Sequence, residues 1–274
     1  MAAPLRAAAA APLSQAPQSL DGLDRACQAA RQSGDLRQLR GLQRSLLQVR
    51  PAPQPLAVVL ANAEALLRCG APDSALVVLN RFSPAAGAER LQWLVLQWRA
   101  ANAALDHRLA AQALRQLAQA ADRSLEQLQL PVAQSDNGRW QNLVALDLLA
   151  GHLEALGLRD QAAEVLLSSR TPGVITAQRL SQAVDLAVAM ALETRLGWLD
   201  QALAQAAAAG AWGLSLSLLD QQLALLVDQP PERRRPVEQR RQRLAQRIDD
   251  AVGLNPAAVR SPRDPGGHAA ASQP

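Results

Sequence analysis

Hydrophobic positions recur along most of the chain at the three- and four-residue spacing of amphipathic helices. The stretch Leu66–Leu79 shows this spacing on both sides of a break, which indicates one helix, a tight turn and a second helix. Gly70 has no Cβ and can adopt the left-handed conformation that ends a helix, and Asp73 can accept hydrogen bonds from the free N–H groups that begin the next one. Ala75 is small enough to let the two helices approach closely. The faces that would meet carry Leu66, Val78 and Leu79.

The same order of glycine, aspartate and alanine returns twice further along the chain. It is found at Gly157, Asp160 and Ala162, and again at Gly197, Asp200 and Ala202. We therefore expect an all-α protein of about ten to twelve helices, arranged as antiparallel hairpins. The expected helices cover about 20–33, 36–47, 55–69, 71–79, 84–104, 107–121, 140–156, 160–169, 176–195, 199–209, 212–227 and 236–250.

Two stretches interrupt this series. Residues 51–55, PAPQP, end the helix before them, and residues 122–138 are irregular, with a strong turn signal at Asp136-Asn137-Gly138. The second stretch is either a functional loop or an insertion, and we favour the insertion. The expected domains are a disordered Ala/Pro-rich leader (1–18), a helical-repeat domain (19–229), a basic capping helix (230–252) and a disordered tail (253–274).

Composition supports the helical interpretation and restricts the charge to one end of the chain. Hydrophobic residues make up 49% of the sequence, mostly Ala, Leu and Val, whereas aromatic residues make up 2% and Tyr is absent. All 28 basic residues are Arg. Residues 1–229 are neutral overall, so the net charge of +4 belongs to residues 230–274. This distribution disfavours a nucleic-acid-binding surface spread over the molecule.

The two cysteines and the N-terminal stretch bear on the compartment. Cys27 and Cys69 have no paired neighbour such as a CxxC, and we interpret both as small apolar side chains, with a disulfide between them left open. The prolines of residues 1–18 interrupt the apolar run that a secretion signal needs, so a disordered leader is favoured over export. No apolar run is long enough to cross a membrane, and the predicted location is cytoplasmic.

The hairpin units resemble the tetratricopeptide repeat. In the first two units a bulky apolar residue lies eleven positions before the glycine, a small one seven before, and leucines four before and nine after. These positions are Val59, Ala63, Leu66 and Leu79 in the first unit and Leu146, Ala150, Leu153 and Leu166 in the second. In the third unit Leu186, Ala202 and Ala206 fit, but Met190 and Glu193 do not. The units are spaced irregularly, so the chain is similar to a degenerate member of that family.

This resemblance implies a right-handed α-solenoid with a concave surface that binds a segment of a partner protein. Each unit's first helix would line that surface. The candidate protein-binding residues carried over by position are Glu64, Arg68, Asp147, Glu154 and Arg195. The alternative is that they are solvated charges on helix faces, as most single charged residues are.

The sequence offers no catalytic residue, no cofactor-binding motif and no metal-binding motif. The three histidines His107, His152 and His268 show no ligand spacing, no GxSxG surrounds a serine, and the absence of Lys excludes a P-loop. We therefore predict a non-enzymatic scaffold or adaptor that mediates protein–protein interaction and needs no cofactor. The partner's identity and the oligomeric state stay open.

The arginine-rich C-terminal helix gives an alternative function. It could bind an anionic membrane surface or nucleic acid, although a nucleic-acid partner is disfavoured because few aromatic side chains are available for stacking. The structural interpretation, which we favour, is a last helix that covers the end of the repeat with its apolar stripe and its Arg stems. The anion-binding candidates are Arg233, Arg234, Arg235, Arg240, Arg243 and Arg247.

Overall fold

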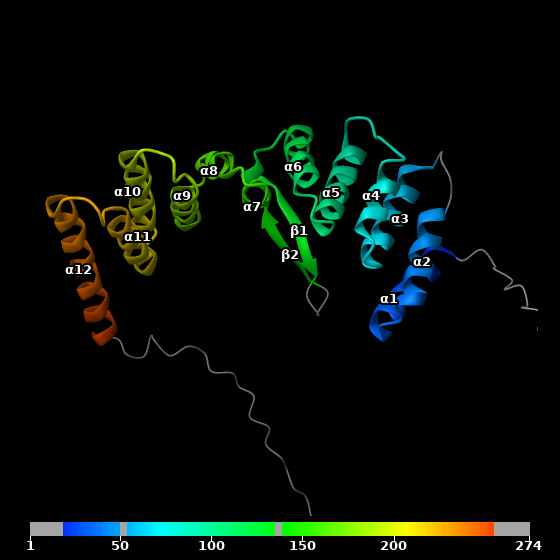
Figure 1. The fold of residues 1–274 in the computed structure, drawn as a ribbon, viewed down its shortest axis with the longest axis horizontal. Helices are drawn as coiled ribbons and strands as arrows, with labels where there is room; N and C mark the ends of the chain where they lie inside the picture. The colour runs from blue at the N-terminus through cyan, green and yellow to red at the C-terminus, as the bar shows by residue number, and fades with distance from the viewer. Residues whose placement is uncertain (1–18, 50–53, 135–138, 255–274) are drawn as a thin grey trace, which may run out of the picture. The chain divides into compact units, whose positions relative to one another are not determined.

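The structure is a computed structural model that describes residues 19–49, 54–134 and 139–254. The described residues form twelve α-helices, one 3₁₀ helix and one two-stranded sheet (Figure 1). The first part contains α1 (Leu20–Ser33), α2 (Leu36–Gln48), α3 (Leu56–Arg68), α4 (Pro72–Leu79), α5 (Ala88–Ala103), α6 (His107–Ala121), η1 (Leu125–Gln127), β1 (Gln129–Gln134), β2 (Trp140–Val144) and α7 (Ala145–Ala155). The second contains α8 (Arg159–Leu167), α9 (Val174–Leu186), α10 (Leu192–Ala208), α11 (Trp212–Leu225) and α12 (Pro231–Leu254).

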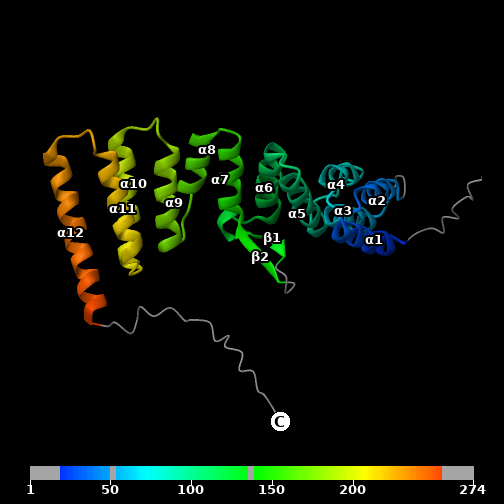
Figure 2. The ribbon, with the colours of Figure 1, turned by 60° about the horizontal axis from the view of Figure 1, so that its bottom comes forward.

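The chain forms two compact units, residues 1–156 and residues 157–274. In the first unit each helix from α1 to α7 packs against the next, and α3 also contacts α1 and α5. In the second unit the same consecutive packing runs from α8 to α12 (Figures 1 and 2). This architecture confirms the predicted all-α fold, in which consecutive helices pack against one another as in a helical repeat. The predicted leader (1–18) and most of the predicted tail (253–274) lie outside the described residues.

The positions that the resemblance assigns to helix packing are buried. In α3 and α4 the residues Val59, Ala63, Leu66 and Leu79 have no exposed surface, and Leu153 of α7 is also buried. Buried apolar side chains of α9, α10 and α11 form the core of the second unit. Met190 and Glu193, the two residues that did not fit the pattern, are exposed.

Helix ends follow the predicted glycine signals at four places. Gly34, Gly70, Gly157 and Gly210 all have a positive φ, between 67° and 74°, in the left-handed region that glycine adopts without steric cost. Predicted N-terminal caps are also present: the side chains of Ser19, Asp35 and Asp106 accept hydrogen bonds from the backbone N–H groups of Gly22, Gln38 and Leu109.

The predicted caps Asp73 and Asp160 are wrong. The helices begin before these aspartates, at Pro72 and at Arg159, and neither helix has a side-chain cap. Each aspartate therefore lies inside the first helical turn. A carboxylate is favourable there because the N-terminus of a helix carries partial positive charge.

The third predicted corner, at Gly197, is also wrong. Gly197 lies inside α10, and the chain instead breaks between Leu186 and Leu192. That break carries no glycine, proline or aspartate, so no turn signal marked it. One glycine inside a helix costs only about 1 kcal/mol, which the buried stripe of Leu199, Ala202 and Ala206 on the same helix outweighs.

In the irregular stretch, residues 125–127 form η1 and residues 129–134 form strand β1. Strands β1 and β2 pair antiparallel with Gln129 opposite Val144, and the register shifts between Pro131 and Ala133. Proline has no N–H to donate to a neighbouring strand, so an irregularity there is expected. The predicted helix start at 140 is wrong, because residues 140–144 are strand and α7 begins at Ala145. The predicted turn at 136–138 lies outside the described residues.

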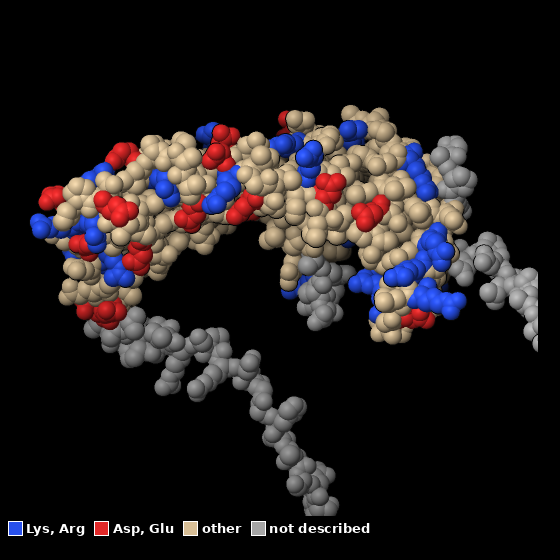
Figure 3. All heavy atoms as spheres, in the orientation of Figure 1, with Lys and Arg blue, Asp and Glu red and all other residues tan. Residues whose placement is uncertain are grey.

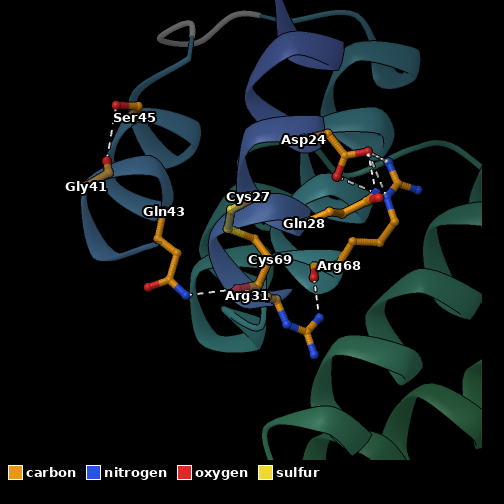
Figure 4. Close-up of a disulfide and its surroundings, with 9 residues drawn as sticks. All are labelled: Asp24, Cys27, Gln28, Arg31, Gly41, Gln43, Ser45, Arg68 and Cys69. Carbon is orange, nitrogen blue, oxygen red and sulfur yellow. Dashed lines mark hydrogen bonds and ion pairs between the residues drawn. A yellow bond between two sulfur atoms is a disulfide. The ribbon is translucent and has the colours of Figure 1, made fainter. Parts of the chain in front are cut away.

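A disulfide joins Cys27 of α1 to Cys69, which follows α3 (Figure 4). The interpretation of the two cysteines as free apolar side chains is therefore wrong, and the alternative left open is correct. Both residues are fully buried, with 5.3 Å between their Cα atoms. Gln43 of α2 donates a hydrogen bond of 3.0 Å to the carbonyl of Cys69, so the bond lies where three helices meet. Sequence missed the pairing because 42 residues separate the two cysteines.

Candidate functional site

Two hollows lie along α3 and α5 in the first unit. The first, of about 530 Å³, is mainly apolar and is lined by Leu60 of α3 and by Leu91 and Val95 of α5, among others. The second, of about 480 Å³, is lined by residues of α1, α3, α5 and the β-hairpin. Arg99 lines both hollows, so they are neighbours. We call the two together the α3–α5 groove.

An ion-pair network lies between the two hollows. The guanidinium of Arg99 donates to both carboxylate oxygens of Glu64, at 2.7 and 3.1 Å. Glu64 also pairs with Arg68 at 3.6 Å, and Arg68 pairs with Asp24 at 2.8 Å. Two carboxylates therefore hold two arginines in fixed positions, and the two-point contact of Arg99 fixes its plane as well.

The second hollow has a basic and aromatic wall. Its lining includes Arg31, Arg68, Arg99, Trp98 and Trp140. The Arg99 guanidinium lies 4.9 Å from the ring centre of Trp140, within the range of a cation–π interaction, and the Trp140 side chain is 44% exposed. Arg31 donates to the backbone carbonyl of Arg68 and has no carboxylate partner among the described residues (Figure 4).

Behind the second hollow, buried His152 of α7 contacts half-buried His107 of α6 and Trp98 of the hollow's lining. The indole N–H of Trp98 donates to Nε2 of His152 at 3.2 Å. An indole can only donate, so the proton of neutral His152 is on Nδ1, which lies 3.1 Å from Nδ1 of His107. Burial, and secondly the charge of His107, lowers the pKa of His152 from 6.5 to about 4. The sequence assigns neither histidine a role, because His107 lies on α6 and His152 on α7 and no local spacing shows that they meet.

The structure separates the five predicted protein-binding residues. Glu64 and Arg68 lie together in the α3–α5 groove. Asp147 and Glu154 are exposed on α7 and line neither hollow. Arg195 belongs to the second unit, where it donates to the backbone carbonyl of Val184 at 3.2 Å. Asp24, Arg99 and Trp140 were missed, because no local pattern relates them to residues 35 or 44 positions away.

The predicted anion-binding arginines lie on α12, where several form ion pairs. Arg233 pairs with Glu193 and Arg240 with Asp200, both on α10, and Arg234 pairs with Glu238 on its own helix. Arg241, which had not been singled out, pairs with Asp220 of α11, and its hydrogen bond to that carboxylate raises the pKa of its guanidinium. Val237 and Leu244 pack against the core of the second unit. On the face drawn in Figure 3, basic and acidic side chains accordingly alternate around α12.

In residues 19–49, 54–134 and 139–254 no group of three or more His, Cys, Asp or Glu side chains is placed to hold a metal ion. Within the same ranges every helix is too short or too polar to cross a bilayer.

Comparison with known proteins gives similarity of fold only. No protein-family model and no curated protein matches the chain. Among solved structures, the chain is similar to one described as the nearly identical TPR-like repeats of a kinesin light chain from Podosopora anserina. The match has 16% identity and a TM-score of 0.28, and it covers 90% of this chain and all of that one. A circular tandem repeat protein matches at 16% identity and a TM-score of 0.20, over 87% of this chain and 47% of its own length.

Proposed function

We propose that the protein is a non-enzymatic scaffold or adaptor that binds an extended segment of a partner protein in the α3–α5 groove. The observation that carries this proposal is the ion-pair network of Asp24, Glu64, Arg68 and Arg99, which lies between an apolar hollow and an arginine–tryptophan hollow. Peptide-binding sites commonly combine an apolar anchor pocket with a few positioned polar groups.

The groove provides for both kinds of contact before any partner arrives. Leu60, Leu91 and Val95 offer apolar surface for a hydrophobic side chain of the segment. Beyond Arg99, the exposed face of Trp140 and the guanidinium of Arg31 offer a stacking surface and a hydrogen-bond donor. Because the arginines are already held by ion pairs, little side-chain freedom is lost on binding.

A non-enzymatic role forms part of the proposal. The carboxylates at the groove, Asp24 and Glu64, are each paired with arginine, an arrangement that suits a binding role better than that of a general base. The alternative, an electrostatic binder of anionic membranes or nucleic acid, would use α12. Ion pairs of Arg233, Arg234 and Arg240 support the capping role of that helix instead.

The disulfide bears on the compartment in which this role is performed. Disulfides persist in oxidising compartments and are rare in a reducing cytosol. The Cys27–Cys69 bond therefore favours an oxidising compartment over the cytoplasmic location expected from the sequence.

Affinity capture with matched variants tests the proposed groove. Val95→Glu places a charge in the apolar hollow, whereas Val77→Glu makes the same change on α4, outside both hollows. We expect Val95→Glu to reduce the recovery of a captured partner by about tenfold or more, and Val77→Glu to leave it unchanged. Equal recovery with the two variants, measured by quantitative mass spectrometry, would exclude the groove as the binding site.

A further inference from the structure

A third hollow, of about 670 Å³, lies in the second unit between α10, α11 and α12. Its apolar lining comes from Leu203, Leu219 and Leu244. The lining also includes Trp212 of α11, whose side chain is 51% exposed. We call this site the α12 hollow. It shares no residue with the α3–α5 groove, which belongs to the other unit.

Three arginines of α12 line one side of this hollow, and two of them lack a carboxylate partner among the described residues. Arg240 lies 3.7 Å from Asp200, an exposed pair at the edge of the hollow. Arg243 donates to the backbone carbonyl of Gln239, and no carboxylate reaches Arg247 in the described part of the chain. The positive charges of Arg243 and Arg247 therefore lie beside apolar surface without a carboxylate partner. This combination suits an anionic ligand that also has an apolar part.

The arginine row is about as long as a short extended peptide segment. Positions 240, 243 and 247 lie on one face of a helix, and at 1.5 Å per residue they form a row about 10 Å long. An extended chain advances about 3.3 Å per residue and directs alternate side chains to opposite sides. Acidic residues at alternate positions would therefore face the arginine row, while the residues between them face Leu203 and Leu219.

We propose that the α12 hollow binds an extended segment of a partner protein in which acidic and aliphatic residues alternate. A membrane surface suits the site less well, because the arginines line a recess with an apolar floor instead of a convex helix face. Nucleic acid suits it less well because Trp212 is the one aromatic residue of the lining, and a phosphate backbone has no apolar group for the leucines.

Binding of a defined peptide to the full chain tests this site. The probe is a short dye-labelled peptide in which glutamate and leucine alternate, and the comparison peptide has glutamine in place of each glutamate. Arg243→Glu and Arg247→Glu should each weaken binding of the glutamate peptide by about tenfold or more, because each removes a charged hydrogen-bond donor. Arg235→Glu is the matched control, since Arg235 is exposed on the same helix and does not line the hollow.

The controls separate this site from general attraction and from the first groove. Unchanged affinity in Arg235→Glu and in Val95→Glu would place binding in the α12 hollow and not in the α3–α5 groove. Equal weakening by Arg235→Glu and Arg243→Glu, or equal affinity for the glutamine peptide, would overturn the proposal. So would retention on heparin or phosphatidylserine vesicles that depends on Arg243 while the peptide does not bind. Thermal unfolding of Arg243→Glu should match that of the control variant.

Discussion

At the scale of single residues, His152 has both ring nitrogens engaged in a buried cluster. Its Nε2 accepts a hydrogen bond from the indole N–H of Trp98. If the ring were charged, Nε2 would also carry a proton, and that proton would point at the indole N–H. The neutral ring fits this cluster and the charged ring does not. The pKa of about 4 in the folded protein, against 6.5 for an unperturbed histidine, follows from this burial.

This lowered pKa predicts acid sensitivity. The unfolded chain takes up the proton first, so the contribution of His152 to stability is complete above pH 6.5 and is lost as the pH falls toward about 4. The loss amounts to about 3 kcal/mol across that window. In His152→Gln the amide oxygen can still accept from Trp98 but does not titrate. Urea unfolding at several pH values should therefore give a flatter curve for this variant, and parallel curves would contradict the assignment.

Two glycines that are each followed by aspartate three positions later and alanine five positions later adopt different conformations. Gly70 has φ +72° at a helix end, whereas Gly197 is helical within α10, and a Cβ added there would meet nothing within 4 Å. Gly70 could be predicted because the apolar pattern also breaks there and Pro72 follows. Gly197 could not, since glycine, aspartate and alanine at the right spacing occur in turns and in helices alike.

Alanine substitution distinguishes these two conformations. Gly197→Ala should raise the free energy of unfolding by about 0.5–1 kcal/mol, because alanine loses less backbone entropy in a helix. Gly70→Ala should lower it by about 1–2 kcal/mol, because a Cβ is strained in the left-handed region. Both changes can be measured by urea denaturation. A similar loss of stability in the two variants would mean that residue 197 forms a corner after all.

At the scale of elements, the β-hairpin shows what local sequence could not supply. Strands β1 and β2 are short, and the start of β2 looked like the beginning of a helix. Contacts with the rest of the unit decide the outcome: Leu130 is buried, and the N–H of Ala145 donates to the carbonyl of Leu128 at 2.8 Å. The consequence for the site is direct, because β2 brings Trp140 against Arg99.

The disulfide determines how firmly α1 and α3 are held together. In an entropic description, closing a loop of 42 residues stabilises the folded state by about 4 kcal/mol. The double variant Cys27→Ala, Cys69→Ala should have a free energy of unfolding lower by about that amount. Added reductant should not change the stability of this variant. The wild-type chain should approach the variant when reduced. Identical melting of the wild type with and without reductant would show that no bond forms.

At the scale of the whole molecule, the helical class could be predicted and the sites could be predicted only in part. Periodicity, caps and glycine corners are local signals, so most helices were placed to within a few residues. Glu64 and Arg68 became candidates because the resemblance assigns their positions to the binding face of a first helix, and the structure places them in contact. Arg99, Trp140 and the leucines opposite the α12 arginines come from other elements, and a single sequence does not record which distant elements meet.

The cystine also changes what a broken chain would look like. Together with the backbone, it closes the polypeptide from Cys27 to Cys69 into a covalent ring that includes all of α2 and α3. A protease that cuts one peptide bond inside this ring opens it without releasing a fragment, so the nicked molecule keeps its full mass until a thiol reagent is added. A cut outside the ring separates the chain at once.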